Sequence, residues 1–516
     1  MRESGKARVR CDRQIGGSLE RVWRTGASIL GLVLALVLAL ASTAVGATFD
    51  TRVANSDGSG EPEIAVNPLN PSNLVVARMH GVSFSRDGGT TWQGASFPES
   101  GGDPAVVADG AGRFFVTYLA EQNGARVFVS VDGGKAWTGA GDPLHGPDLP
   151  VAPGAMQVNS QGPVYLGPWA IVACDREFLA VDRSTGTLYA SCVDHGDASG
   201  GESGSAWELP FLACRANGFS SSVLTYCGRR YISVSRDHGQ TWSGWLPEDS
   251  PEYPAGYTGA FAGIPTAARG VLATAYVASQ AKGSSCSPCA VFETSTDAGQ
   301  SWSRHLIPAQ PSIYSFSPSN PTGPNSAGQH VGNDSQNVWF EPYVAADPSR
   351  SGHYAVMLLD KNRTHLLVFV TRDAGATWSA PARLGGRQPG FRDKPAIAFA
   401  PDGSLGVTWK SAYPDRSYSF DVWAAVAARG DTRFEPTVRL NDATSPQQPC
   451  GTGTQGEAYT CDELDWTVMG NRYLYSVWGD GRGGENPWFG RYGYASATHR
   501  VRRQAHHRHK PKPRPR

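Results

Sequence analysis

The chain has 516 residues, including 61 Gly, 36 Pro and 15 Trp, and only 18% of its residues are charged. Short strands joined by Gly- and Pro-rich turns build sandwiches, barrels and propellers, so this composition favours an all-β fold. The formal net charge is zero, but residues 27–498 hold 31 basic and 43 acidic residues, which argues against nucleic acid as a partner of the folded region.

Residues 1–47 are predicted to be a leader rather than part of the fold. An Arg-rich segment precedes the apolar run Ile29–Leu40, and the small residues Val45-Gly46-Ala47 follow. This order predicts a secretory signal peptide cleaved near Ala47. The alternative is an uncleaved signal anchor, because the run extends toward the roughly 20 residues that a membrane span needs. The first alternative predicts a secreted or extracytoplasmic protein, and the second predicts a membrane-anchored one.

The cysteines agree with export. Cys11 lies in the leader, and the other eight fall into near-neighbour pairs, which predicts disulfides in an oxidising compartment. Cys286-Ser287-Pro288-Cys289 is a CxxC, and we favour a loop staple because a redox motif would need a βαβ setting that this sequence lacks. The eight residues are Cys174, Cys192, Cys214, Cys227, Cys286, Cys289, Cys450 and Cys461.

One pattern, Ser/Thr-x-Asp-x-Gly-x-x-Trp, occurs five times. Its Asp accepts hydrogen bonds from backbone N–H groups of its own turn, and its Gly supplies the positive φ that tight hairpins often need. Its Trp returns the chain to an apolar surface. The copies are Ser85–Trp92, Ser130–Trp137, Ser235–Trp242, Ser295–Trp302 and Thr371–Trp378.

These copies resemble the Asp boxes of the BNR-repeat superfamily, which includes the sialidases. The resemblance covers about residues 55–495 and implies a β-propeller of four-stranded antiparallel blades. It also implies that each Asp box joins the third and fourth strands of a blade, on the face away from an active site. The box aspartates are therefore expected to be structural: Asp87, Asp132, Asp237, Asp297 and Asp373.

We assign residues 48–498 to this propeller and favour seven blades. A short apolar strand, often opened by an acidic residue and Pro, recurs seven times, and Pro suits the first position of a strand. Six blades remain the alternative, because the family's sialidases have six and residues 138–230 are hard to divide. Thr48–Asn55 is predicted to close the last blade. The seven strands begin near residues 61, 103, 176, 263, 341, 394 and 463.

The long connections are predicted to open on the face opposite the Asp boxes, and function usually resides in such loops. They are rich in aromatic residues, which can stack on sugar rings or pack the loops themselves. We therefore expect a glycan or glycoconjugate partner on this face, and a monomer.

Asp and Arg follow the second strand in three late blades. Converging guanidinium groups can grip a carboxylate, whereas the alternative is an ion pair that closes each loop. Acidic residues near the predicted mouth could serve acid/base chemistry, bind Ca²⁺ or cap turns. No cofactor is required by the sequence. The candidate catalytic residues are Arg363, Arg392, Asp393, Glu341, Asp480 and Arg482.

The sequence is compatible with two alternative functions. The family's sialidases carry an Arg-Ile-Pro motif near the first strand, where this chain reads Ser59-Gly60-Glu61-Pro62-Glu63-Ile64. That departure favours a propeller that binds glycan or protein at the cell exterior. The alternative is an exo-acting glycoside hydrolase of exo-α-sialidase type.

Residues 499–516 form a basic, Pro-rich segment predicted to be disordered. Eight basic and no acidic residues would allow electrostatic contact with a cell-wall polymer or a membrane surface. A solvated tail without such a contact is the alternative.

Overall fold

Antiparallel strands build the part of the chain that the structure, a computed structural model, describes; no helix, and hence no membrane-spanning helix, occurs within it. The predicted leader 1–47 and tail 499–516 lie outside the described residues. The description runs from 48 to 494 apart from residues 54–60, 80, 98–101, 121–123, 142–155, 160–161, 166–173, 198–225, 245, 249–263, 279–282, 287–288, 311–341, 361, 363, 414–418, 430–431, 447–448, 453–457, 461–464 and 483–485.

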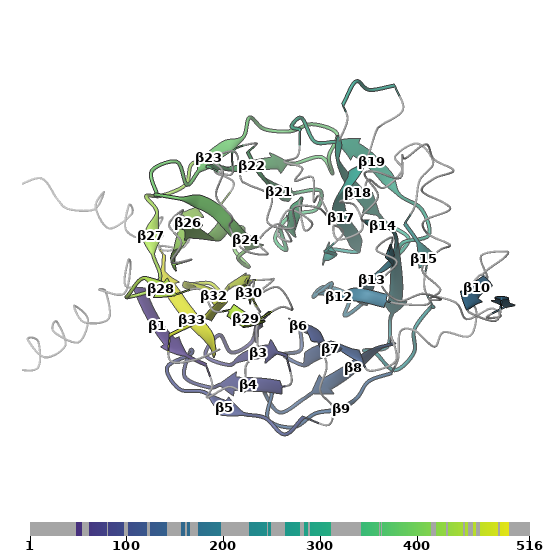
Figure 1. Cartoon of the computed structure of the whole chain (residues 1–516), viewed down its shortest axis with the longest axis horizontal. Helices are drawn as coiled ribbons and strands as arrows, with labels where there is room; N and C mark the ends of the chain where they lie inside the picture. The colour runs from purple at the N-terminus through teal and green to yellow at the C-terminus, as the bar shows by residue number, and fades with distance from the viewer. Residues whose placement is uncertain are drawn as a thin grey trace, which may run out of the picture. The chain divides into compact units, whose positions relative to one another are not determined.

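Seven four-stranded blades surround a central axis, which confirms seven blades against six (Figure 1). In each of the first six blades the strands pair in chain order, from the inner strand to the outer one. The first three blades are β2 (Glu63–Val66), β3 (Leu74–Arg78), β4 (Gly81–Ser85) and β5 (Gln93–Gly94); β6 (Gly102–Ala108), β7 (Phe114–Ala120), β8 (Gly124–Ser130) and β9 (Thr138–Gly139); and β12 (Cys174–Val181), β13 (Leu188–Asp197), β14 (Tyr226–Ser235) and β15 (Leu246–Pro247).

The next three blades repeat this order. Two short hairpins, β10 (Met156–Asn159) with β11 (Gly162–Tyr165) and β29 (Pro449–Thr452) with β30 (Ala458–Thr460), lie between blades in the chain. Blades 4 to 6 are β16 (Thr266–Ala268), β17 (Val271–Ala278), β18 (Cys289–Ser295) and β19 (Ser303–Leu306); β20 (Tyr343–Ala346), β21 (Tyr354–Leu359), β22 (Leu366–Thr371) and β23 (Ala382–Leu384); and β24 (Phe391–Phe399), β25 (Leu405–Ala412), β26 (Ser419–Ala427) and β27 (Val438–Arg439), with β28 (Ser445–Pro446) also on β26.

The last blade joins the two ends of the described chain. It consists of β31 (Trp466–Met469), β32 (Tyr473–Asp480), β33 (Asn486–Gly493) and, as its outer strand, β1 (Thr48–Arg52). β1 pairs antiparallel with β33 from Thr48 opposite Tyr492 to Arg52 opposite Trp488. The predicted closing role of the first strand is therefore confirmed.

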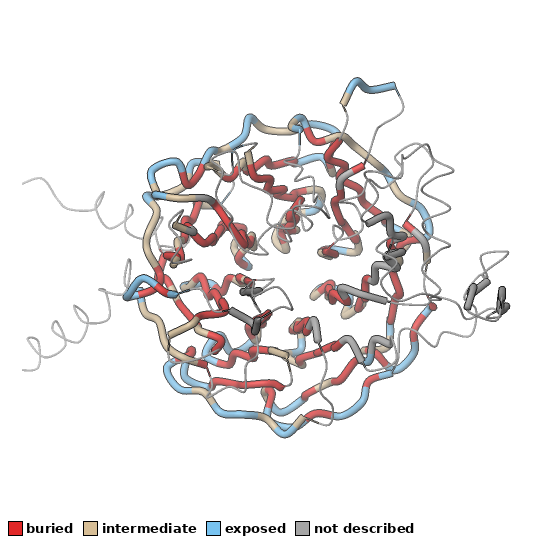
Figure 2. The backbone as a smooth tube through the Cα atoms, viewed as in Figure 1, coloured by how far each residue is buried: buried red, intermediate tan, exposed pale blue. Residues whose placement is uncertain are grey.

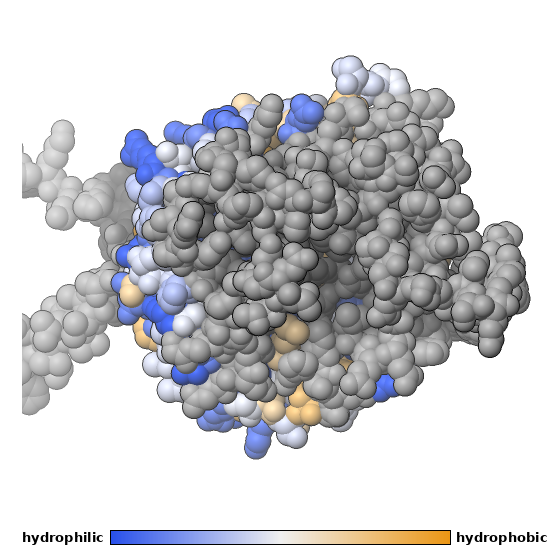
Figure 3. Space-filling model, in the orientation of Figure 1, coloured by the Kyte–Doolittle hydropathy of each residue, from blue (hydrophilic) through white to orange (hydrophobic). Residues whose placement is uncertain are grey.

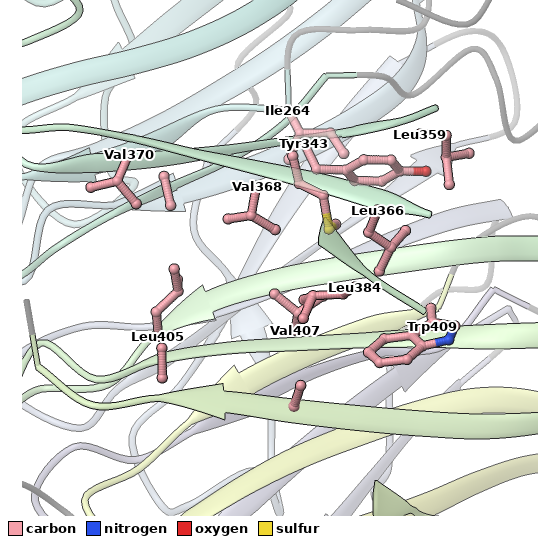
Figure 4. Packing of buried hydrophobic residues seen from close by; sticks show 14 of the residues in the cluster. Ile264, Tyr343, Leu359, Leu366, Val368, Val370, Leu384, Leu405, Val407 and Trp409 are labelled. Atoms are coloured by element: carbon pink, nitrogen blue, oxygen red, sulfur yellow. The ribbon is translucent and has the colours of Figure 1, made fainter. Parts of the chain in front are cut away.

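A hydrophobic cluster lies at each of the seven blade interfaces. Figure 2 shows these buried residues along the blades, with exposed residues along the outer edge. Between blades 5 and 6, Val407 and Trp409 of β25 pack in one cluster with Leu366 and Val368 of β22 (Figure 4). Because each blade buries its faces only against its neighbours, closure of the ring by β1 is expected to contribute to the stability of every blade.

The Asp boxes form turns between the third and fourth strands, as expected. In the first copy the Ser85 hydroxyl donates to Asp87 Oδ1 at 2.8 Å, and the backbone N–H groups of Thr90 and Thr91 donate to the same oxygen at 2.9 Å. Hydrogen bonds from the Thr241 hydroxyl and backbone hold the pKa of Asp237 at about 2. These contacts are the local turn bonding expected of structural aspartates.

Turns between first and second strands pack against the Asp boxes on the same face. Asn73 at the start of β3 donates to Gly133 O of the next box at 2.9 Å, and Ala374 N donates to Gly352 O at 2.9 Å. The connections on this face hold ten residues or fewer. The long connections, 140–173, 198–225, 248–265 and 307–342, all belong to the opposite face, because antiparallel strands alternate in direction. In Figure 3 the described residues of the outer edge are mostly hydrophilic.

Candidate functional site

The N-terminal ends of the seven inner strands meet on the face of the long connections, and we call this region the channel mouth. Three inner strands carry a bulge there, in β6 between Gly102 and Ala105, in β12 between Asp175 and Phe178, and in β24 between Asp393 and Ala396. Bulges redirect side chains and are common beside active sites. Their repetition makes the channel mouth the candidate site.

Two of the six described non-glycine residues with a positive φ lie in this region, and the other four lie in turns of the opposite face. Glu61 and Lys394 have φ angles of 57° and 42°, and each directly precedes a proline. A residue before Pro prefers an extended backbone, so a positive φ there is unfavourable and has to be held by its surroundings. Strained residues of this kind gather at binding and catalytic sites.

A buried carboxyl group, Glu63, lies at the mouth on β2. The residue is only 2% exposed, and its Oε2 accepts a hydrogen bond from Val106 N of the neighbouring inner strand at 2.9 Å. Its Oε1 has no hydrogen-bond partner among the described residues. Burial raises the pKa of Glu63 well above its ordinary value, against the hydrogen bond from Val106. The neutral acid is then the favoured form and can donate a proton or a hydrogen bond.

A buried ion pair crosses from blade 6 to blade 7. Lys410 Nζ lies 3.2 Å from Asp465 Oδ1, donates to Gly479 O at 3.2 Å, and sits 4.3 Å from the centroid of the Phe420 ring. Lys410 also lies opposite Asp393 in the pairing of β24 with β25. The channel mouth thus combines acidic and basic side chains shielded from water, where electrostatic interactions are stronger than at the surface.

The candidate pair Arg392 and Asp393 begins β24, and both residues are almost fully buried. The Arg392 guanidinium donates to Gln388 O at 2.5 Å, Gly390 O at 2.7 Å and Thr364 O at 3.2 Å, and to the Ser411 hydroxyl. Burial lowers the pKa of Arg392 to about 10, against the opposing charge of Asp360. These contacts tie the loops of blades 5 and 6 together.

The candidates Asp480 and Arg482 lie at the end of β32. Arg482 lies 2.9 Å from Asp480, 3.0 Å from Asp50 and 2.6 Å from Asp442, and its guanidinium stacks 3.6 Å from the centre of the Trp488 ring. Ser445 and Trp478 also donate to Asp480 Oδ2, at 2.6 and 2.9 Å. In blade 7 a loop-closing ion pair of the kind predicted as the alternative therefore forms, and it extends to β1 through Asp50.

The other candidates, Glu341 and Arg363, lie outside the described residues. The structure brings Arg392 beside Asp393 and Arg482 beside Asp480, each pair with its own internal partners. The catalytic roles suggested for these six residues stay predictions. No cluster of three or more metal-ligating side chains occurs in the described part of the chain, and Ca²⁺ binding stays a prediction too.

One predicted disulfide falls among the described side chains. Cys286 and Cys289 are bonded, in the connection between β17 and β18 of blade 4. The bond closes a short loop, as the staple interpretation expects. The side chains of the other six cysteines that follow the predicted leader lie outside the description.

Comparison with known proteins finds only distant similarity to solved structures. No family model and no curated protein matches this chain. Among solved structures it is similar to the Hadza microbial sialidase Hz136, with 15% identity, 81% of this chain and 73% of that chain covered, and a TM-score of 0.42. It is also similar to a protein of unknown function from Dyadobacter fermentans DSM 18053, with 13% identity, 86% of this chain and 98% of that chain covered, and a TM-score of 0.43. A third similar structure is YCF48 bound to D1 peptide, with 10% identity, 88% of this chain and 99% of that chain covered, and a TM-score of 0.40.

Sequence reasoning missed Glu63, Lys410 and Asp465 as members of the site. Glu63 belongs to the quoted Glu61-Pro62-Glu63 segment, where two acids flank a strand-opening Pro, and this was the available signal. Lys410 and Asp465 are 55 residues apart in the sequence and meet only across a blade interface. No local pattern could have paired them.

The raised pKa of Glu63 predicts that the stability of the fold depends on pH, and that Glu63→Gln removes this dependence. The folded protein binds this proton more tightly than the unfolded chain, so stability falls as pH rises above about 4.5, by about 1.4 kcal/mol per pH unit until the folded pKa is passed. Glu63→Gln should lack this contribution. Urea unfolding at pH 5, 6, 7 and 8 should therefore show that the free energy of unfolding of the variant increases relative to that of the wild type as pH rises. Parallel pH profiles would show that Glu63 is not a buried neutral acid.

Proposed function

We propose that this chain is an exported propeller that binds a glycan or a protein at the cell exterior through the face of the long connections. The asymmetry of the two faces carries the proposal. One face consists of short turns locked by their own hydrogen bonds, and the other carries every long connection around the channel mouth. Variable loops on a rigid scaffold are the usual location of binding sites.

The chemistry of the mouth and its loops suits a wet, polar ligand. Trp339, Tyr314 and Tyr257 belong to the long connections by sequence, and aromatic rings of this kind stack on sugars. The described arginines of the candidate set are held by internal partners, which supports structural roles for them. These internal contacts favour ligand binding over glycoside hydrolysis as the function of this face.

Glycoside hydrolysis of exo-sialidase type is the second candidate, and Glu63 favours it. Glycosidases use a carboxylic acid with a raised pKa as the general acid, and burial raises the pKa of Glu63. Asp393 and Asp465 lie on neighbouring blades of the same mouth and would be the carboxylates to test with it.

Export and surface contact belong to the same proposal. The apolar run Ile29–Leu40 would direct the chain across the membrane, and cleavage near Ala47 would release it. The basic segment 499–516 would hold it near an anionic wall polymer or membrane surface. N-terminal sequencing of the mature protein tests the cleavage.

The binding proposal is tested by incubating the purified protein with an immobilised glycan panel and, separately, with extracellular proteins from the producing cell. We expect saturable binding that Trp339→Ala or Tyr314→Ala weakens roughly tenfold, the loss of one stacking contact with its surrounding interactions. Val131→Ala is the matched control, because Val131 is 78% exposed on an Asp-box turn of the opposite face. Equal loss in the control, or no saturable binding to either class, would count against the proposal.

A further inference from the structure

The inner strands of all seven blades line a central cavity of about 200 Å³. Most of the lining is small and apolar. Toward the channel mouth, Trp466 of blade 7 stacks on Phe178 of blade 3 with the ring centroids 6.1 Å apart, and Phe399 and Met469 line the opposite end. The small apolar residues of the lining include Ala65, Val107, Ala108, Val181, Ala267 and Ala346.

Arg183 is the one charged residue among the described residues of this lining. It lies in the turn after β12, at the end of the channel away from the mouth, because the inner strands run from the mouth toward the Asp-box face. Its Nε donates to Ala108 O of the neighbouring inner strand at 3.1 Å.

The terminal nitrogens of Arg183 make no hydrogen bond or ion pair with the described part of the chain. Asp109, whose charge acts on Arg183, is paired instead with Arg113 at 2.6 Å. Burial lowers the pKa of Arg183 from its ordinary value, against the charge of Asp109. Arg183 is partly exposed, so its guanidinium keeps contact with solvent while two of its nitrogens remain able to pair with an anion that enters the channel.

We propose that the central channel binds a small carboxylate with an apolar body, such as an aromatic acid or a short alkyl acid. The Arg183 fork would take the carboxylate in bidentate fashion, and the ring of alanines and valines would cover the body. An engineered apolar cavity of about 150 Å³ holds benzene, so the space suits one ring or a short chain. This site is separate from the face of the long connections and does not depend on the function proposed there.

Benzoate and the uncharged benzyl alcohol, which has a similar shape, test the proposal by calorimetric titration of the full-length protein. We expect benzoate to bind the wild type at least about tenfold more tightly than benzyl alcohol, the effect of a charge-assisted hydrogen bond. Arg183→Met should remove this preference, and Arg183→Lys should keep part of it. Arg269→Met is the matched control, because Arg269 is an exposed arginine in the equivalent turn of blade 4, outside the channel lining.

Near-ultraviolet circular dichroism first establishes that each variant is folded. If Arg183→Met does not fold, Arg183→Lys and the wild-type preference for benzoate over benzyl alcohol decide the matter. Benzoate binding no tighter than that of benzyl alcohol in the wild type would overturn the proposal. A preference unchanged in Arg183→Met would overturn it as well, as would a loss of equal size in Arg269→Met.

Discussion

Arg482→Met should lower the free energy of unfolding by about 3–5 kcal/mol, the usual loss when one member of a buried ion pair is removed. Arg482 joins three carboxylates, from β1, from the end of β32 and from the connection between β27 and β28, at distances of 2.6 to 3.0 Å. The Asp480 side chain is fully buried and that of Asp50 is 5% exposed, so the variant leaves two shielded carboxylates without this cation.

The loss should extend to the whole ring, because Asp50 belongs to β1, the strand that closes it. Burial already raises the pKa of Asp50, against the hydrogen bond from Arg482, so without Arg482 that carboxyl should tend to protonate. Arg482→Lys should recover only part of the stability, since Lys keeps the charge but lacks the planar fork and the stacking on Trp488.

Urea unfolding followed by tryptophan fluorescence measures this effect. Arg383→Met is the control, because its side chain is 56% exposed and its ion pair with Asp360 is 3.4 Å long, for which we expect less than about 1 kcal/mol. A variant at Arg482 as stable as the control variant would contradict the structural role. If the Arg482 variant kept its stability but lost glycoside hydrolysis, Arg482 would have a catalytic role instead.

Arg230→Met should have a similarly large effect at the interface of blades 3 and 4. Arg230 lies 3.0 Å from both Glu248 and Glu293, and Arg304 lies 2.8 Å from Glu293. The Arg230 side chain is 3% exposed and stacks 3.7 Å from the centre of the Tyr276 ring. We expect a loss of about 3–5 kcal/mol, because the substitution leaves buried carboxylate charge with one cation fewer.

A double variant separates the ion pair from simple packing. Glu248→Gln removes one of the charges that Arg230 balances, so Arg230→Met with Glu248→Gln should be more stable than the sum of the single losses allows, by roughly 1 kcal/mol or more. The same urea titration measures all three variants. Strict additivity would show that Arg230 acts through packing alone.

The sequence predicted the repeat because its signals are local. The seven inner strands begin within three residues of the predicted positions, since each is opened by a turn and an apolar run that the sequence displays. The hairpin β10–β11 between blades 2 and 3 was not predicted. It lies in residues 138–230, which carry no Asp box before Ser235 and were hard to divide.

The site was less predictable because its contacts join distant segments. Asp480 and Arg482 were recognised as a local pair, but Asp50 lies 432 residues from Arg482 and only ring closure brings them together. Arg392 is a candidate catalytic residue by sequence, whereas the structure surrounds its guanidinium with carbonyl oxygens of the preceding turn. Burial and partner choice at blade interfaces depend on all seven blades and leave no local pattern.

We propose that this propeller binds its ligand without cleaving it, and release of fluorophore from a fluorogenic sialic-acid glycoside distinguishes binding from cleavage. The purified protein at high concentration, with Ca²⁺ present, should release no more fluorophore than a protein-free control. Turnover that Arg363→Ala abolishes in a variant of unchanged stability would contradict this proposal and establish a sialidase.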